Sequence, residues 1–302
     1  MFEIFSETDN TIIYAAPDST ILDASLKANI NHTYVCGGNA RCSTCRVYVV
    51  DGLSNCRPRN EKEKELSEKL GFPQNIRLAC QTKINGNITI RRPVVDNLDA
   101  EIILKQFGDA TRTKLGQEKD LAILFTDIEN YTQFAEAFPA YDIVHVLNRY
   151  YQTMNKIIVQ HKGIISDVAG DGILALFGVI EDSKNPVLDA INAVRAMNTS
   201  LIQFNTYLNQ MYDQSFGIRA GINFGKVIVG NFDTGKMSKI SAIGDAVNLA
   251  SRIETANKDF GTKLLISQSA HEAVEGLVET HKMYRARLKG KSGEYFLYDV
   301  EM

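Results

Sequence analysis

Hydrophobic and polar positions alternate with the period of a β-strand in several short runs of the first 90 residues. These runs predict strands at 2–5, 11–14, 46–50 and 84–90. The first two runs flank the turn-forming pair Asp9-Asn10, which predicts a β-hairpin. The opening third of the chain is therefore expected to be built on a small sheet.

Two segments between these strands have helical spacing. Apolar positions at 21–26 predict a helix whose cap is Asp18 or Ser19. A second helix, 61–70, is expected to begin after Asn60 and to end at Gly71. We interpret the Glu and Lys residues at 61–65 as a solvated face stabilised by i,i+4 pairs.

The pattern becomes irregular after residue 91, although apolar positions at 97–107 predict a short amphipathic helix. The run at 121–125 is then continuously apolar, which is typical of a strand buried on both faces. Apolar residues recur at helical spacing over 142–160 and 186–208, and their aromatic and Met side chains are expected to be core.

Composition agrees with a soluble, two-domain protein. The 302 residues are 44% hydrophobic and 23% charged, and the longest apolar runs are shorter than the roughly 20 residues of a membrane span. We therefore expect a cytoplasmic protein without a membrane span. The net charge of -3 includes no basic face, so nucleic acid is not an expected partner.

Four cysteines supply the first candidate chemistry. Cys36, Cys42 and Cys45 share one Gly-containing loop, and Cys80 lies further along the chain. Four soft thiolates in this C-x5-C-x2-C arrangement with a distant fourth suit two irons, and the glycines allow amide N–H groups to approach the sulfurs. A structural zinc site is the alternative, but it usually has two paired C-x2-4-C units. The fifth cysteine, Cys56, is interpreted as a thiol that binds no metal.

Residues 1–91 resemble the [2Fe-2S] ferredoxins, with the longer first spacing of the adrenodoxin type. The resemblance implies a β-grasp domain in which Cys36, Cys42, Cys45 and Cys80 hold a [2Fe-2S] cluster. It also implies an electron donor or acceptor, either a protein or a small redox molecule. The alternative interpretation of the charged run at 61–65 is then a surface on which a redox partner docks, as acidic helices of ferredoxins can do.

Two carboxylates follow apolar strands in the second part of the chain. Asp127 comes directly after 121–125, and Asp171 lies in Ala-Gly-Asp-Gly between two β runs, at the expected tip of a hairpin. Two such carboxylates can bind hard cations such as Mg²⁺ and leave coordination positions for phosphate oxygens.

Two further segments, Gly217 to Gly230 and Ile243 to Glu254, complete a set of motifs in order and spacing. From about Asp120 to Met302 the chain resembles the class III nucleotidyl cyclases. This resemblance implies a ferredoxin-like βαββαβ domain that converts a nucleoside triphosphate to a 3′,5′-cyclic nucleotide and pyrophosphate. A near P-loop at Gly230–Met237 is rejected because Met237 stands where a hydroxyl must bind Mg²⁺.

The resemblance assigns roles to particular residues. Asp127, Asp171 and the Ile128 carbonyl correspond to ligands of two Mg²⁺ or Mn²⁺ ions. Asn248 and Arg252 share a helix face and correspond to the pair that orients the ribose and stabilises the transition state. The family places these two groups on different protomers, which implies a homodimer. A phosphate-binding Lys is expected at Lys289 or Lys291.

Asp167 and Ser241 occupy the positions expected to read the purine base. A carboxylate can accept hydrogen bonds from guanine N1–H and N2–H₂, whereas it would face the adenine N1 lone pair. Adenine N6–H₂ can nevertheless donate to either side chain, and bacterial members of the family more often use ATP. ATP is therefore placed slightly ahead of GTP.

The expected protein is an α+β chain of two domains, residues 1–91 and 120–302, joined by a coupling segment, residues 92–119. The main hypothesis is a cyclase regulated by the presence or redox state of its [2Fe-2S] cluster. One alternative is a guanylate cyclase that acts on GTP. The other is an electron-transfer ferredoxin with a non-catalytic, cyclase-like dimerisation module.

Overall fold

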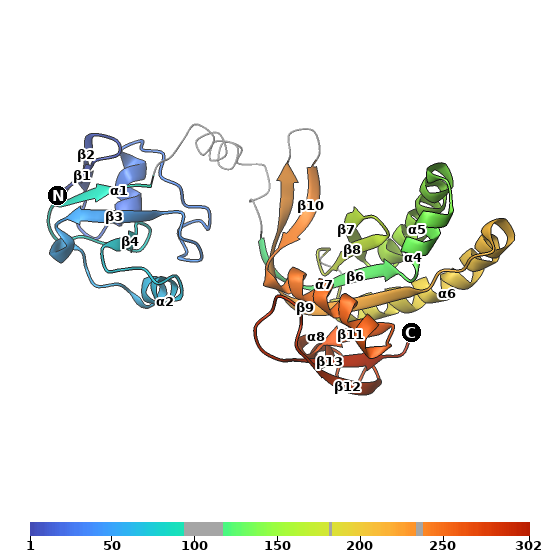
Figure 1. Cartoon of the computed structure of the whole chain (residues 1–302). Coiled ribbons are helices and arrows are strands. Elements are labelled where there is room, and N and C mark those ends of the chain that lie inside the picture. The colour runs from blue at the N-terminus through green and yellow to red at the C-terminus, as the bar shows by residue number, and fades with distance from the viewer. Residues whose placement is uncertain (94–116, 181–182, 234–237) are drawn as a thin grey trace. The chain divides into compact units, whose positions relative to one another are not determined.

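The structure, a computed structural model, describes residues 1–93, 117–180, 183–233 and 238–302. It divides into two compact units, residues 1–112 and 113–302. The expected helix at 97–107 lies outside the described residues, as does most of the segment proposed to couple the domains. Each unit is described by itself below (Figure 1).

The N-terminal unit is a five-stranded sheet with the strand order β2-β1-β5-β3-β4. Its strands are β1 (Phe2–Ser6), β2 (Thr11–Ala15), β3 (Arg46–Asp51), β4 (Ile76–Leu78) and β5 (Ile88–Arg91). The predicted hairpin is confirmed, because β1 and β2 pair antiparallel through a turn in which Asn10 has φ of 47°. The last expected strand is shorter than predicted, since Ile84 makes only an isolated bridge to Cys56.

Two α-helices accompany this sheet, α1 (Ile21–Lys27) and α2 (Glu61–Lys69), together with the short 3₁₀ turn η1 (Leu53–Asn55). The predicted cap of α1 is wrong. Thr20 is the N-cap, because its hydroxyl accepts from the Asp23 backbone N–H while the Asp23 carboxylate accepts from the Thr20 backbone. The predicted cap of α2 is confirmed, since the Asn60 side chain accepts from the Glu63 backbone N–H.

Glu63 is an exception to the interpretation of α2 as a solvated charged face. The rest of the run at 61–65 is exposed, and Lys64 pairs with Glu68 at i,i+4. The Glu63 side chain is 0% exposed and forms two hydrogen bonds of 2.9 Å with the Arg77 guanidinium, which is 5% exposed. It also accepts from the Leu78 backbone N–H at 2.8 Å and from the Thr82 hydroxyl at 3.2 Å. A buried carboxylate needs such partners, so Glu63 fastens α2 to β4 and to Thr82, on either side of the turn that contains Cys80.

The C-terminal unit is an eight-stranded sheet with the order β12-β13-β11-β9-β6-β8-β7, and β10 pairs with β9. The strands are β6 (Gln117–Ile128), β7 (Gly163–Ala169), β8 (Gly172–Phe177), β9 (Ile218–Asp233), β10 (Ser238–Ile243), β11 (Leu264–Ser267), β12 (Thr280–Ala286) and β13 (Tyr295–Val300). The helices are α4 (Tyr131–Ala137), α5 (Ala140–Gln160), α6 (Pro186–Tyr212), α7 (Asp245–Phe260) and α8 (Gln268–Ala273). The order β6-α5-β7-β8-α6-β9 is the expected βαββαβ core.

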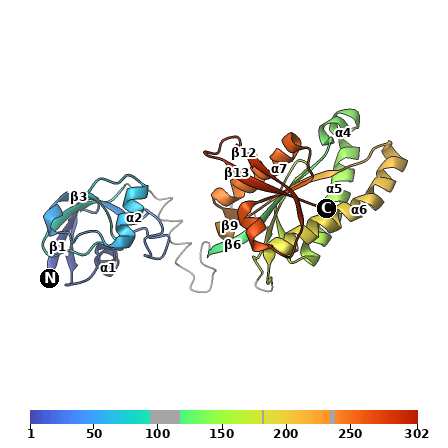
Figure 2. The ribbon, with the colours of Figure 1, turned by 90° about the horizontal axis from the view of Figure 1, so that it is seen from below.

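Strand β6 is buried on both faces, as its apolar sequence predicts. Ala122 and Leu124 belong to the larger core beneath α5 and α6, which lie side by side (Figures 1 and 2). Leu121 and Ile123 belong to a second core that includes Ala250 of α7. Because side chains alternate along a strand, α7 covers the opposite face of the sheet.

Helix α7 lies unusually close to β9. A Cβ atom on Gly221 would lie 2.1 Å from the backbone nitrogen of Glu254, so only glycine allows this approach. Together with the antiparallel pairing of β6 and β9, this contact brings one turn of α7 close to the end of β6 that carries Asp127.

We predict that Glu63→Ala strongly destabilises the N-terminal unit, because Arg77 would remain buried without its partner. The expected loss is about 3–5 kcal/mol of unfolding free energy, measured by urea denaturation of the full-length chain. Hydrogen exchange at the Leu78 amide should also become faster. The control Glu65→Ala removes an exposed carboxylate of the same helix and should change stability by less than about 0.5 kcal/mol. Equal effects of the two substitutions would contradict the structural role of Glu63.

Candidate active site and cysteine loop

Asp127 and Asp171 lie side by side at one edge of the C-terminal sheet. Asp171 is in the β7–β8 turn after Gly170, which has φ of 61°, and its Oδ2 accepts from the Ile128 backbone N–H at 3.2 Å. Burial and the neighbouring Asp127 carboxylate raise the pKa of Asp171 to about 6. Two adjacent carboxylates repel each other when both are ionised, and a divalent cation bound to both would offset that repulsion.

Two residues of α7 complete the surroundings of Asp127. The Lys258 ammonium lies 3.5 Å from Asp127 Oδ2, and Glu254 is buried nearby, with its Oε1 unpaired among the described residues. Burial and the Asp127 charge raise the pKa of Glu254 to about 7. A Lys cation thus stands beside Asp127, which indicates that the site is built for positive charge.

Asn248 and Arg252 are exposed on α7. Within the described parts of the chain, neither side chain bonds to Asp127 or Asp171. The two candidate phosphate-binding lysines differ in their surroundings. Lys291 is 10% exposed and pairs with Asp245 at the start of α7, whereas Lys289 is exposed.

The candidate base-reading residues come together at β10. Asp167 of β7 forms an ion pair with Lys239 of β10, with 3.0 Å between Oδ2 and Nζ. The Ser166 hydroxyl donates to the Ile240 carbonyl at 3.0 Å, which joins the two strands. Ser241 lies two residues beyond Lys239 and is opposite Gly230 in the β9–β10 register.

The loop that carries three cysteines has a left-handed backbone at Gly37, Gly38 and Ala40, with φ of 69°, 80° and 54°. A Cβ atom on Gly38 would lie 3.8 Å from the Cβ of Cys80, so the loop closes over the fourth cysteine. This conformation lets successive backbone N–H groups point inward, as a binding site for sulfide needs.

The four thiols form two neighbouring pairs. Hydrogen bonding to Cys80 raises the pKa of Cys45, and the same contact lowers the pKa of Cys80. Burial opposes the change at Cys36, but hydrogen bonds from the Arg41 backbone and from Cys42 lower its pKa. The Gln81 amide donates to Cys80 Sγ at 3.3 Å and to the Gly38 carbonyl at 2.8 Å. Paired thiols with such donors fit the ligand set of an iron-sulfur cluster.

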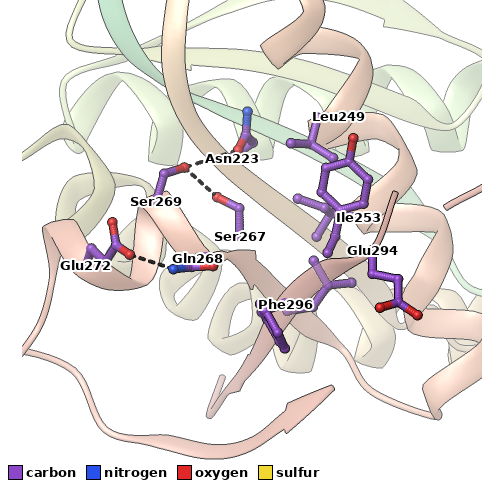
Figure 3. Close-up of a pocket in the computed structure, with 11 residues that line it drawn as sticks. Asn223, Leu249, Ile253, Ser267, Gln268, Ser269, Glu272, Glu294 and Phe296 are labelled. Carbon is purple, nitrogen blue, oxygen red and sulfur yellow. Dashed lines mark hydrogen bonds between the residues drawn. The ribbon is translucent and has the colours of Figure 1, made fainter. Parts of the chain in front are cut away.

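A pocket of about 360 Å³ lies next to α7, between α8, β9 and β13 (Figure 3). Leu249 and Ile253 line it from α7, so it shares the helix that carries Asn248 and Arg252. Several of its polar groups are already paired, since Ser269 bonds with Ser267 and the Gln268 amide donates to Glu272. None of the carboxylates proposed to bind metal lines this pocket.

Among the residues that the structure describes, no three or more His, Cys, Asp or Glu side chains converge closely enough to hold a single metal ion. The four cysteines lie as two pairs instead, Cys36 with Cys42 and Cys45 with Cys80, which suits a cluster of two irons. No helix within the described ranges is long and apolar enough to cross a membrane.

Comparison with known families identifies both parts of the chain. Residues 114–300 match the family model for the adenylate and guanylate cyclase catalytic domain. Residues 4–85 match the 2Fe-2S iron-sulfur cluster binding domain. The chain therefore belongs to the class III adenylate and guanylate cyclase family, and its N-terminal domain is of the 2Fe-2S ferredoxin type.

Similar proteins include both kinds of cyclase. Adenylate cyclase 1 of Rhizobium meliloti is 28% identical over 182 residues, which are 60% of this chain and 27% of the relative. The adenylate cyclase of Anabaena cylindrica is 31% identical over 179 residues, which are 58% of this chain and 35% of the relative. The chain thus spans about a third or less of these relatives.

Solved structures show the same mixture. The guanylyl cyclase Cya2 is 30% identical with a TM-score of 0.57, and the match covers 61% of this chain and 93% of that one. The adenylyl cyclase CyaB from P. aeruginosa is 27% identical with a TM-score of 0.56, and the match covers 62% of this chain and 95% of that one.

Three charged residues near these sites were not predicted from the sequence: Lys239, Glu254 and Lys258. Glu254 and Lys258 are i,i+4 on α7, which indicated a shared face but gave no sign that Asp127 lies opposite them. Lys239 was passed over because its partner Asp167 is 72 residues away in sequence.

The raised pKa of Asp171 leads to a prediction about metal binding. A carboxylate must be ionised to bind a cation, so Mn²⁺ affinity should begin to fall at about pH 6, where this group starts to protonate. Below that pH the affinity should fall about tenfold for each pH unit.

Electron paramagnetic resonance of free Mn²⁺ measures this titration. Asp171→Asn should weaken binding at all pH values, whereas Asp259→Asn, an exposed change on α7, should leave the titration unaltered. Affinity that stays constant down to the ordinary range of aspartate pKa values would contradict this account.

Proposed function

We propose that this protein is a nucleotidyl cyclase that converts a purine nucleoside triphosphate, ATP in preference to GTP, into a 3′,5′-cyclic nucleotide and pyrophosphate. The observation that carries this proposal is the pair of adjacent carboxylates, Asp127 and Asp171. The pKa of Asp171 is raised to about 6, and the Lys258 ammonium lies beside Asp127. These are the residue types that intramolecular attack of the ribose 3′-oxygen on the α-phosphorus needs.

Asp127, Asp171 and the Ile128 carbonyl would hold two divalent ions, which supply charge neutralisation at the phosphates and the attacking oxygen. The protein's own part is positional. The Ile128 backbone N–H holds the Asp171 carboxylate through a hydrogen bond, and the turn that carries Asp171 is held by the pairing of β7 with β8. Lys258 must leave Asp127 when the ions bind, because both compete for the same carboxylate.

Asn248 and Arg252 would act on substrate held by a second copy of the chain. Both are exposed on α7. An exposed Arg can offset charge on the phosphorus only if another surface encloses it, so we propose a homodimer with two shared sites. Lys289 is the better candidate for a phosphate contact, since Lys291 is engaged with Asp245.

Mixing two inactive variants tests the shared site. Asp171→Ala and Arg252→Ala should each abolish cyclic nucleotide production without loss of fold. When the two are unfolded together and refolded, half of the dimers carry one intact site, and about a quarter of the wild-type activity should return. If the mixture stays inactive, the two groups of residues do not come from different protomers.

We further propose that Cys36, Cys42, Cys45 and Cys80 hold a [2Fe-2S] cluster and that its presence or redox state regulates turnover. A cluster of this kind supplies one-electron redox chemistry. Its physiological electron partner would be a protein or a small redox molecule. The alternative, an electron-transfer protein with a non-catalytic cyclase module, is disfavoured by the complete set of Asp127, Asp171, Asn248 and Arg252.

A chain of hydrogen bonds inside the N-terminal unit supports this regulation. The Cys45 carbonyl accepts from Nε2 of His32 at 3.3 Å, and burial followed by the Arg92 charge lowers the pKa of His32 to about 4, so the ring is neutral. The carbonyl of the adjacent Asn31 accepts from Arg92 at 2.7 Å. Arg92 also binds Asp9, and its backbone exchanges hydrogen bonds with Thr8.

Arg92 is the first residue of the segment, residues 92–119, that is proposed to couple the two domains. A shift of the cysteine loop would therefore reach the end of the domain through only a few contacts. We predict that Arg92→Gln keeps the cluster but reduces the difference in turnover between oxidised and reduced protein to less than about twofold, because the charged hydrogen bonds to Asp9 and Asn31 are lost.

Visible absorption monitors the cluster while cyclic nucleotide is quantified in each redox state. The matched control is Arg91→Gln, since Arg91 is exposed and its Cζ lies 5.8 Å from the centroid of the Tyr48 ring. It should keep the full redox response. A response that survives unchanged in Arg92→Gln would refute the route, and no response in the wild type would refute redox regulation itself.

A further inference from the structure

The ion pair between Asp167 and Lys239 has no evident structural purpose. Both side chains are about half exposed, 55% and 48%, and a surface pair of this kind adds little stability. The pair nevertheless lies next to Ser241, at the positions proposed to contact the base. A charged donor and a charged acceptor, 3.0 Å apart and open to solvent, are available to a ligand.

A β-bulge in β7 determines where the Asp167 side chain lies. The register between β7 and β8 shifts between Ile165 and Asp167, so the strand bends at Ser166. Bulges re-aim side chains, and here two consecutive residues reach β10: Ser166 bonds to the Ile240 carbonyl and Asp167 binds Lys239. Asp167 Oδ1 also accepts from the Val168 backbone N–H at 3.0 Å, which fixes the carboxylate.

Lys239 and Ser241 are two residues apart on β10, so their side chains leave the same face of the strand. Asp167 approaches this face from β7. The ammonium can only donate, the carboxylate can only accept, and the hydroxyl can do both. Such a set is able to read the polar edge of a purine.

We infer that Lys239 is a specificity-determining residue that reads the purine base together with Asp167. This inference rests on the proposed function and extends it by one residue. An isolated Asp167 favours guanine, which offers the adjacent donors N1–H and N2–H₂, and it repels the lone pair of adenine N1. Lys239 can donate to adenine N1 or to guanine O6. Guanine already has two bonds to Asp167 without it, whereas adenine N1 has no other partner there, so Lys239 matters more for adenine.

Opposite substitutions should therefore shift base preference in opposite directions. Lys239→Met leaves Asp167 without its cation, and the ratio of kcat/KM for ATP to that for GTP should fall about tenfold, the size expected for one charged hydrogen bond. Asp167→Asn removes the charged acceptor that guanine N1–H and N2–H₂ both use, while Lys239 can still donate to adenine N1, so the same ratio should rise. A purely structural pair would lower both rates together and leave the ratio unchanged.

The control is Lys226→Met, which removes an exposed lysine of β9 that lies 3.9 Å from Glu118. It should not alter the ratio. Affinities for the fluorescent analogues mant-ATP and mant-GTP, measured with Ca²⁺ on the full-length protein, give a second readout that does not depend on turnover.

The outcomes separate the two claims. If the wild type binds the analogues but forms neither cyclic product, the proposed function fails, and the binding ratio of the variants still decides the role of Lys239. If the ATP-to-GTP ratio is the same in wild type, Lys239→Met and Asp167→Asn, the assignment of Lys239 is overturned. If the wild type binds neither analogue, both claims fail.

Discussion

The repulsion between two neighbouring carboxylates, Asp127 and Asp171, is the interaction around which the C-terminal unit is arranged. Strand β6 ends at one carboxylate, the β7–β8 turn carries the other, and the Ile128 N–H holds Asp171 in place. Folding brings these like charges together and partly buries them, which raises the pKa of Asp171 to about 6. Helix α7, packed on Gly221, adds the Lys258 cation and the buried Glu254. This arrangement of charges supports the proposal that the unit binds divalent cations and a nucleoside triphosphate.

In the N-terminal unit, by contrast, the buried charges lie next to charges of opposite sign. Glu63 pairs with Arg77, and Asp9 pairs with Arg92. The first pair fastens α2 beside the turn that contains Cys80, and the second closes the end of the domain. The contacts that lead from the cysteine loop toward Arg92 are the bond from His32 to the Cys45 carbonyl and the bond from Arg92 to the Asn31 carbonyl.

The sequence was a good guide where local rules decide the structure. The β1–β2 hairpin, the Asn60 cap and the doubly buried strand β6 all follow from alternation, capping preference and continuous apolar residues. Thr20 replaced the expected cap because the reciprocal bond with Asp23 outweighs the alternatives. Glu63 was misread because a surface pattern says nothing about a cation 14 residues away. The Asp167–Lys239 and Asp127–Lys258 pairs were missed for the same reason, since both depend on long-range packing of strands and a helix.

The central claim, that this chain is a cyclase carrying a redox cluster, is tested most directly by a competition assay. Anaerobically purified protein would be given Mn²⁺ with equal ATP and GTP, and cyclic AMP and cyclic GMP would be quantified together while visible absorption confirms the cluster. The account predicts cyclic nucleotide, with cyclic AMP predominant. Predominant cyclic GMP would overturn the purine choice alone. Folded, cluster-containing protein that forms neither product would contradict the account and favour a non-catalytic, electron-transfer role.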